Sequence, residues 1–258
     1  MTDQTVLSRE EFEGEADRLL GAAREAGVTL RLLGALAFRR HCPTYGSLQD
    51  RLQRHYTDID FAGYGTDAER IRSLFRELGY KEDAEVYINS EGSRFVFEPV
   101  TSGTHVDVFL DKLEFCHTIS WKNRLEQDDP TIPLADLLLE KMQIVEINEK
   151  DLIDAAMLLL EHDLGEGDDE TVNVGYVASL CGADWGLHRT VTMNLDKVRS
   201  YAHNNSLVRD EERAVLDERV AATLGRIQRE PKTVKWKLRS RVGDRVRWYR
   251  DVGEVAPG

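Results

Sequence analysis

The chain has 258 residues, of which 41% are hydrophobic, enough to bury a substantial core in one large domain or two small ones. Its formal net charge of −13 would repel a polyanion taken as a whole, which argues against a general nucleic-acid coat or packaging role. Long apolar runs are absent and the first residues are polar and acidic, so we expect a cytoplasmic protein without a membrane span, a signal peptide or a membrane partner.

The three cysteines, Cys42, Cys116 and Cys181, lie far apart and show no paired spacing. This pattern argues against a disulfide framework and against a zinc cluster. We interpret all three as ordinary buried or half-buried thiols.

The first part of the chain alternates helical and strand patterns. Ser8 and Glu11 form a capping-box pattern before apolar residues at helical spacing, which predicts a helix over 9–26. A short apolar strand over 28–33 follows, and Gly34 separates it from a helical segment. That helical segment covers 35–40. After a polar, turn-rich connection at 43–54, further patterns occur at 57–62 (strand), 68–78 (helix), and 85–89, 94–99 and 105–110 (strands).

These elements predict one mixed sheet with helices, and strand signals vanish from Pro133 onward. An acidic, glycine-containing segment at 161–170 is typical of a solvated linker. We therefore expect an α+β protein with a mixed-sheet domain over 1–130 and an all-helical domain over 131–258. The expected helices of the second domain lie at 134–147, 150–162, 171–181, 184–203, 209–229 and 233–249.

Three aspartates in two predicted strands carry most of the chemical information. Asp58 and Asp60 alternate with Ile59, so both carboxylates face one side of the sheet while Ile59 faces the core. Asp107 occupies a later strand. If that strand lies beside the first in the same orientation, the three carboxylates meet at one point.

Carboxylates so close together raise one another's pKa, and a divalent cation relieves the repulsion. Mg²⁺ or Mn²⁺ prefers oxygen ligands and commonly uses a few carboxylates together with substrate phosphates. Nucleotidyl transfer has this requirement, because metal ions activate the attacking hydroxyl and hold the triphosphate. We assign Asp58, Asp60 and Asp107 as catalytic metal ligands, with Asp107 also assisting deprotonation of the acceptor. The competing interpretation is a solvated outer strand face.

Glycines offer two candidate phosphate turns. Gly34 ends an apolar strand and opens a helix, so a phosphate could approach the backbone amides at the helix N-terminus. Gly46 with Ser47 is the alternative, although it lies in a loop-like segment. The competing interpretation of either glycine is a plain turn residue.

A lysine in the helical part could contribute to the same chemistry. Lys141 could pair with triphosphate oxygens, and Asp151 and Asp154 could orient it from the next helix. The competing interpretations are an exposed helical lysine and solvated acids.

In this order the residues resemble the DNA polymerase β-type nucleotidyltransferase superfamily, whose members combine a glycine turn, an Asp-x-Asp strand and a third acid on a later strand. The nearest similarity is to the AbiEii-like toxins of toxin and antitoxin pairs. The similarity covers roughly residues 28–162. The matching motifs are Leu33-Gly34-Ala35, Arg54-His55-Tyr56-Thr57-Asp58-Ile59-Asp60, Glu140-Lys141 and Lys150-Asp151-Leu152-Ile153-Asp154.

The resemblance implies a nucleotidyltransferase domain over 1–130 that binds a nucleoside triphosphate such as ATP. It implies nucleotide contacts from Gly34, Ala35, Thr57, Lys141 and Asp154. Since Ala35 lacks the hydroxyl that many relatives have, only backbone amides would hold a phosphate there. The resemblance also implies an RNA acceptor, tRNA in particular, and an antitoxin protein as partner.

Three functions remain open from the sequence. A transferase acting on RNA could use the segment 226–250, where ten cations face two acids and Trp236 and Trp248 are interspersed, although these aromatic residues could equally pack on the helices. A transferase acting on a small molecule of the aminoglycoside type would suit the acidic chain better. The third function is a nucleotide-binding module without catalysis.

Overall fold

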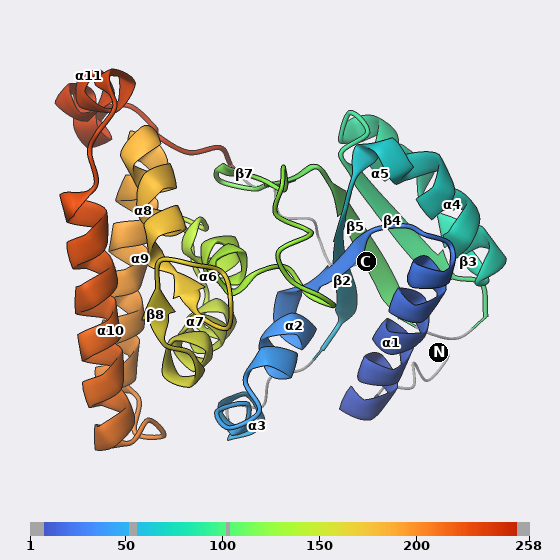
Figure 1. Ribbon diagram of the computed structural model, residues 1–258, viewed down its shortest axis with the longest axis horizontal. Coiled ribbons are helices and arrows are strands. Elements are labelled where there is room, and N and C mark those ends of the chain that lie inside the picture. Colours follow the sequence, from blue (N-terminus) through green and yellow to red (C-terminus); the bar gives the residue numbers. More distant parts are fainter. Residues whose placement is uncertain (1–7, 52–55, 102–103, 252–258) are drawn as a thin grey trace. The chain divides into compact units, whose positions relative to one another are not determined.

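The structure is a computed structural model that describes residues 8–51, 56–101 and 104–251. The chain divides into two compact units: unit 1 comprises 1–40, 55–113 and 120–132, and unit 2 comprises 41–54, 114–119 and 133–258. Two short segments from the first half of the chain thus belong to the second unit, where the sequence had suggested a single boundary near residue 130. Unit 1 carries the mixed sheet and unit 2 carries most of the helices (Figure 1).

Unit 1 is built on a five-stranded mixed sheet with the strand order β1-β2-β5-β4-β3. The central neighbours β2 and β5 are parallel, and the other neighbouring pairs are antiparallel. The strands are β1 (Leu30–Leu33), β2 (Asp58–Gly63), β3 (Tyr80–Glu82), β4 (Arg94–Pro99) and β5 (His105–Leu110).

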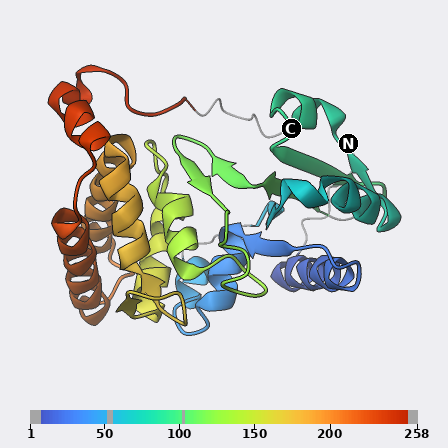
Figure 2. The same ribbon diagram turned by 45° about the horizontal axis from the view of Figure 1, so that its top comes forward.

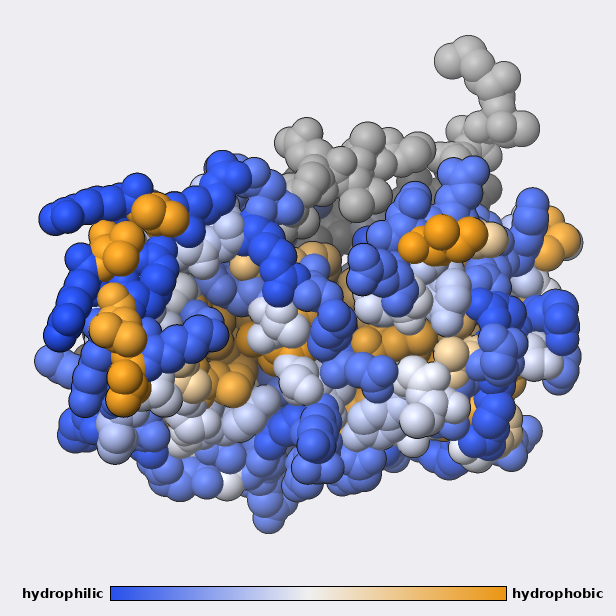
Figure 3. Space-filling model, turned by 90° about the horizontal axis from the view of Figure 1, so that it is seen from above, coloured by the Kyte–Doolittle hydropathy of each residue, from blue (hydrophilic) through white to orange (hydrophobic). Residues whose placement is uncertain are grey.

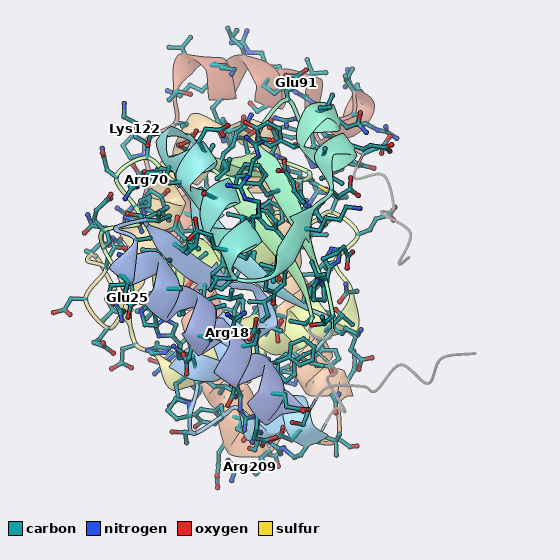
Figure 4. The ribbon with its side chains drawn as sticks, turned by 90° about the vertical axis from the view of Figure 1, so that its right-hand side faces the viewer. Arg18, Glu25, Arg70, Glu91, Lys122 and Arg209 are labelled. Atoms are coloured by element: carbon teal, nitrogen blue, oxygen red, sulfur yellow. The ribbon has the colours of Figure 1, made fainter. Side chains whose placement is uncertain are left out.

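Helices cover the apolar face of this sheet. Phe75 of α4 stacks on Phe97 of β4 with ring centroids 4.2 Å apart, and Phe97 is paired with Val106, which is paired in turn with Ile59. Directly paired residues share a face, so α4 lies on the side of Ile59. In Figure 4, α1 and α4 lie side by side in front of the sheet. The helices of unit 1 are α1 (Arg9–Glu25), α2 (Gly34–His41), α4 (Ala68–Glu77) and α5 (Ala84–Asn89), with a 3-10 turn over Gly65–Asp67.

Local sequence signals explain which of the predicted helices and strands of unit 1 were right and which were wrong. The helix expected at 9–26 is confirmed as α1, and the Ser8 and Glu11 capping box is present. The strand expected at 85–89 is wrong, because this segment forms α5. Asp83 caps α5 by accepting hydrogen bonds from the backbone N–H groups that follow it, and the strand that completes the sheet is β3 instead.

Unit 2 is mainly helical, so the α+β class with a helical C-terminal region is confirmed. Figures 1 and 2 agree that α8, α9 and α10 lie side by side. The unit's helices are α3 (Ser47–Arg51), α6 (Leu134–Met142), α7 (Glu149–Glu161), α8 (Val174–Ala183), α9 (Trp185–Asn204), α10 (Asp210–Arg229) and α11 (Val234–Val242), followed by a 3-10 turn over Gly243–Arg245. None of the helices in the described ranges is long and apolar enough to cross a membrane.

Short strands interrupt this helical pattern. β8 (Leu164–Gly165) lies in the expected linker and β9 (Val172–Asn173) at the start of the helix expected over 171–181, and the two form a small parallel sheet. Earlier in the chain, β6 (Lys112–Glu114) pairs with β7 (Thr118–Ser120). Strands of two residues carry too little periodicity to be recognised from sequence alone. Likewise, the polar connection expected at 43–54 contains α3.

Candidate metal centre

The structure brings Asp58, Asp60 and Asp107 together on one face of the sheet in unit 1. Asp60 on β2 is paired directly with Asp107 on β5 in the parallel register, and Asp58 lies two residues before Asp60 on the same face. One carboxylate oxygen from each of the three residues lies within 4.8 Å of the other two. The arrangement is the one that the Asp-x-Asp pattern and the later aspartate led us to expect.

The opposite face of these strands explains why the carboxylates point the way they do. Ile59, Phe61, Val106 and Val108 are fully buried, and their alternation with the aspartates leaves the acids no place in the apolar layer. Asp58 and Asp60 remain partly exposed, whereas Asp107 is 3% exposed. The site therefore has an open side formed by β2 and a closed side formed by β5.

Arg94 on β4 compensates the most buried carboxylate of the cluster. Its Nε donates to Oδ1 of Asp107 at 3.0 Å and its terminal NH2 donates to Oδ2 at 2.8 Å, a bidentate pair. The guanidinium also lies 5.1 Å from the ring centroid of Phe109. One of the three negative charges is thus already balanced by the protein.

Sequence reasoning missed Arg94, although a signal for it was present. Alternation along β4 places Arg94 on the same face as Val96, and Val96 is paired with Asp107. The two strands were both expected from sequence, but their pairing and register were not. Only the register shows that this arginine reaches the aspartate.

Thr57 lies beside the cluster, immediately before β2. Its hydroxyl donates to Oδ1 of Asp58 at 2.9 Å, and its backbone carbonyl accepts a hydrogen bond from the Thr104 hydroxyl at 3.3 Å. Thr57 is therefore placed to orient the Asp58 carboxylate. Arg54 and His55, which precede it in the motif, lie outside the described residues.

Gly34 also borders the carboxylates, at the junction of β1 and α2. Leu33 is paired with Asp60, and Gly34 follows it with a φ of +72°, in the left-handed region. A Cβ placed on Gly34 would lie 2.3 Å from Oδ2 of Asp60, so only glycine allows the turn to pass this close. Ala35 comes next and is partly exposed.

The alternative glycine turn belongs to the other unit. Gly46 donates its backbone N–H to the carbonyl of Cys42 at 2.7 Å, and Ser47 begins the short helix α3. Both residues are part of unit 2, whereas Gly34 and the three aspartates are part of unit 1. Gly34 is therefore the turn that the structure associates with the carboxylates within a single unit.

Lys141 and Asp154 lie in unit 2 and are buried, at 7% and 0% exposure. The Lys141 Nζ lies 2.7 Å from Glu140, 3.4 Å from Asp151 and 3.6 Å from Asp154. Burial acts to lower the pKa of Lys141, but these three carboxylates outweigh it and raise the pKa above its ordinary value. Neither an exposed lysine nor a solvated Asp154 describes this cluster, because the side chain of Gln49 also donates to Asp154 at 2.8 Å.

Comparisons with known proteins add no assignment, since no protein-family model, no curated protein and no solved structure matches the chain. The geometry of the carboxylates is thus the basis for assigning a function.

The donor set can be tested against the expected metal. Three carboxylates supply hard oxygen ligands, which suit Mg²⁺ or Mn²⁺ and not the softer ions that prefer thiolate or imidazole. Arg94 balances the charge of Asp107, and a divalent cation bound by the three carboxylates would relieve their mutual repulsion. The residues present fit a divalent cation with open positions for substrate oxygens.

Proposed function

We propose that this chain is a metal-dependent nucleotidyltransferase that moves a nucleoside monophosphate from a nucleoside triphosphate to an acceptor hydroxyl. In this reaction the acceptor oxygen forms a bond to the α-phosphorus, the bond from that phosphorus to the bridging oxygen breaks, and pyrophosphate leaves with its electron pair. The acceptor proton passes to a base. The observation that carries the proposal is the convergence of Asp58, Asp60 and Asp107 on one face of the sheet.

Each residue of unit 1 has a distinct task in this proposal. Asp58 and Asp60, which are partly exposed, would hold Mg²⁺ or Mn²⁺ together with Asp107. The bound metal supplies charge neutralisation at the triphosphate and a more acidic acceptor hydroxyl. Thr57 orients Asp58, and the backbone amides at the Gly34 turn, which lies against Asp60, would hold a phosphate.

Arg94 fixes the orientation of Asp107. Each oxygen of Asp107 accepts one hydrogen bond from Arg94 and keeps a further lone pair, so Arg94 would set the direction from which Asp107 takes the acceptor proton. Arg94 is a positioning residue in this scheme, because it acts through Asp107.

Lys141 and Asp154 remain proposed nucleotide contacts from unit 2. The carboxylates around Lys141 hold it in its charged form, which is the form that attracts triphosphate oxygens. A triphosphate would have to compete with these carboxylates for the ammonium group. Nucleotide binding by Lys141 therefore depends on the outcome of this competition, whereas metal binding by the three aspartates does not.

An incorporation assay tests the proposal. The protein is incubated with each α-labelled triphosphate, Mg²⁺ or Mn²⁺, and total tRNA, an aminoglycoside or no added acceptor. We expect label on one acceptor class, and Asp58→Ala should lower the rate by at least about a hundredfold with the fold intact. Asp210→Asn, at an exposed aspartate of α10, is the matched control and should retain full activity.

The same assay separates the acceptors and the inactive alternative. Label on tRNA would support an RNA-modifying toxin with an antitoxin partner in the cytoplasm, and label on a cationic small molecule would fit the net charge of −13. Binding of Mn²⁺ and nucleotide without label on any acceptor would favour a binding module. An Asp58→Ala protein as active as its parent would overturn the proposal.

A further inference from the structure

The outward face of α11 carries an apolar row whose side chains are exposed among the residues that the structure describes. Val234, Leu238 and Val242 stand four residues apart, which places them in one line along the helix. Their exposed fractions are 74%, 56% and 39%. Figure 3 shows hydrophobic side chains gathered at the α11 end of the molecule among hydrophilic ones. We refer to these three residues as the α11 stripe.

Cations flank the α11 stripe on both sides. At the angular spacing of an α-helix, Lys235 lies on one side of the stripe, and Lys237 and Arg241 lie on the other. All three are exposed, α11 contains no acidic residue, and none of the three forms an ion pair with another described residue. Other arginines near this end do have carboxylate partners, in the pairs Arg189–Asp244, Arg247–Asp251 and Arg250–Glu114.

The inner face of α11 is aromatic and is engaged with α9. The ring of Trp236 meets the ring of His188 edge-on at 5.2 Å, and the guanidinium of Arg239 lies 4.6 Å from the ring centroid of Trp185. The outward face is therefore aliphatic and offers no ring on which a base could stack. A single-stranded nucleic acid would leave the α11 stripe unused.

The dimensions of the stripe also argue against a protein partner. A helix of nine residues is about 14 Å long, and the stripe occupies one side of it. Stable protein interfaces bury about 800 Å² on each partner, which is more than this face provides. A lipid surface has no such minimum, because it accommodates a short apolar row and places anionic headgroups around it.

We propose that α11 lies on an anionic phospholipid surface. Val234, Leu238 and Val242 enter the boundary between headgroups and acyl chains, while Lys235, Lys237 and Arg241 contact the lipid phosphates. The proposal departs from the sequence-based expectation of no membrane partner, but it requires no membrane span, since the helix lies along the surface without crossing the bilayer. The proposal is independent of nucleotidyl transfer, because it uses no residue of the carboxylate cluster.

Vesicle flotation with the full chain tests the proposal. We expect the protein to float with vesicles of phosphatidylcholine and phosphatidylserine, and to remain behind with phosphatidylcholine alone. Each flanking cation contributes about fivefold to partitioning, so Lys235→Gln, Lys237→Gln and Arg241→Gln together should lower it by about a hundredfold. Val234→Ser, Leu238→Ser and Val242→Ser together should also abolish flotation although every cation remains.

A matched control separates the stripe from exposed apolar residues in general. Ile88 and Val100, in unit 1, are 72% and 68% exposed, and Ile88→Ser with Val100→Ser should float like the parent. As a second readout, the tryptophan fluorescence that Leu238→Trp adds should be quenched by brominated acyl chains, and in anionic vesicles only. Absence of flotation by the parent would overturn the proposal, as would full flotation of the triple serine variant. RNA or an acidic peptide is added as a competitor for the vesicles. If the competitor displaces the parent from the vesicles, and if the triple serine variant still binds the competitor, α11 would be assigned to that partner instead.

Discussion

Gly34 lies against the Asp60 carboxylate so closely that an added methyl group would be 2.3 Å from Oδ2. Because its φ is also +72°, Gly34→Ala should both strain the turn and push Asp60 out of the cluster. We expect a loss of at least about 1 kcal/mol in unfolding free energy and a weaker affinity for Mn²⁺. Chemical denaturation and titration calorimetry measure the two effects separately.

The control for this substitution is Gly79→Ala. Gly79 has a φ of +87° and open space where a Cβ would be, so it tests backbone strain without a neighbouring carboxylate. It should lose stability and keep the affinity for Mn²⁺. Equal losses of Mn²⁺ affinity in the two variants would mean that the contact with Asp60 does not matter.

Asp60→Asn should change how the protein responds to metal. Removing one of three clustered carboxylates relieves repulsion, so the metal-free variant should be at least as stable as the parent. Mn²⁺ at a hundred times its dissociation constant should stabilise the parent by about 2.7 kcal/mol and the variant hardly at all. Thermal denaturation with and without Mn²⁺ measures this difference. If Mn²⁺ shifts the melting temperature of both proteins equally, that result would argue against a metal site here.

Arg94→Ala should leave Asp107 as a buried charge without a cation. The side chain of Asp107 is 5% exposed, so we expect the metal-free protein to lose about 2–3 kcal/mol. Mn²⁺ should restore more stability to this variant than to the parent, because the metal takes over the charge compensation. Arg94→Lys keeps the charge but loses the bidentate geometry, and it should fall between the two. A stabilising effect of Mn²⁺ that is the same in all three would contradict the compensation.

Lys141→Met should destabilise the protein before it affects any ligand. The substitution removes Lys141 from the buried carboxylates of Glu140 and Asp154 and from the half-buried carboxylate of Asp151, at a cost of about 3–5 kcal/mol. Lys150→Met, at an exposed position of α7, is the control and should change little. A Lys141→Met protein of normal stability with weakened triphosphate binding would show that the lysine serves the substrate alone.

Unit 2 should lose stability in mild acid because of His117. Burial lowers the pKa of His117 from its ordinary 6.5 to about 4, with a smaller opposing effect of Asp184 and a small lowering effect of Arg250. Above pH 6.5 the imidazole is neutral in both states, so the full stability is present. As pH falls from 6.5 to about 4, only the unfolded chain takes up the proton, which costs about 1.4 kcal/mol for each pH unit.

Denaturation of the parent and of His117→Gln across this pH range tests whether the free energy of unfolding falls as the pH falls. The glutamine variant should show a shallower decline, although not a flat one, because burial also lowers the pKa of His188 to about 4. If the free energy of unfolding declines with equal slope in both proteins, His117 does not contribute to the pH dependence of stability.

The sequence predicted those parts of the structure that depend on local pattern. The capping box at Ser8 and the alternation of Asp58, Ile59 and Asp60 are local signals, and both correspond to what the structure contains. The segment 85–89 was misread because its strand-like composition is overridden by the Asp83 cap. Pairing across strands cannot be read locally, so Arg94 was missed even though its strand was expected.

The parallel pairing of β2 with β5 has a consequence for how the chain reaches its native strand register. Since α4, β3, α5 and β4 intervene between these two strands, their pairing closes a long loop, and we expect it to form after the local elements. A slip of one residue would set Val106 or Val108 opposite Asp60 and bury Asp107 among phenylalanines and valines. A chain in the shifted register would have to place the charge of Asp107 in the apolar core. The aspartates that we propose as metal ligands therefore also favour the native strand register.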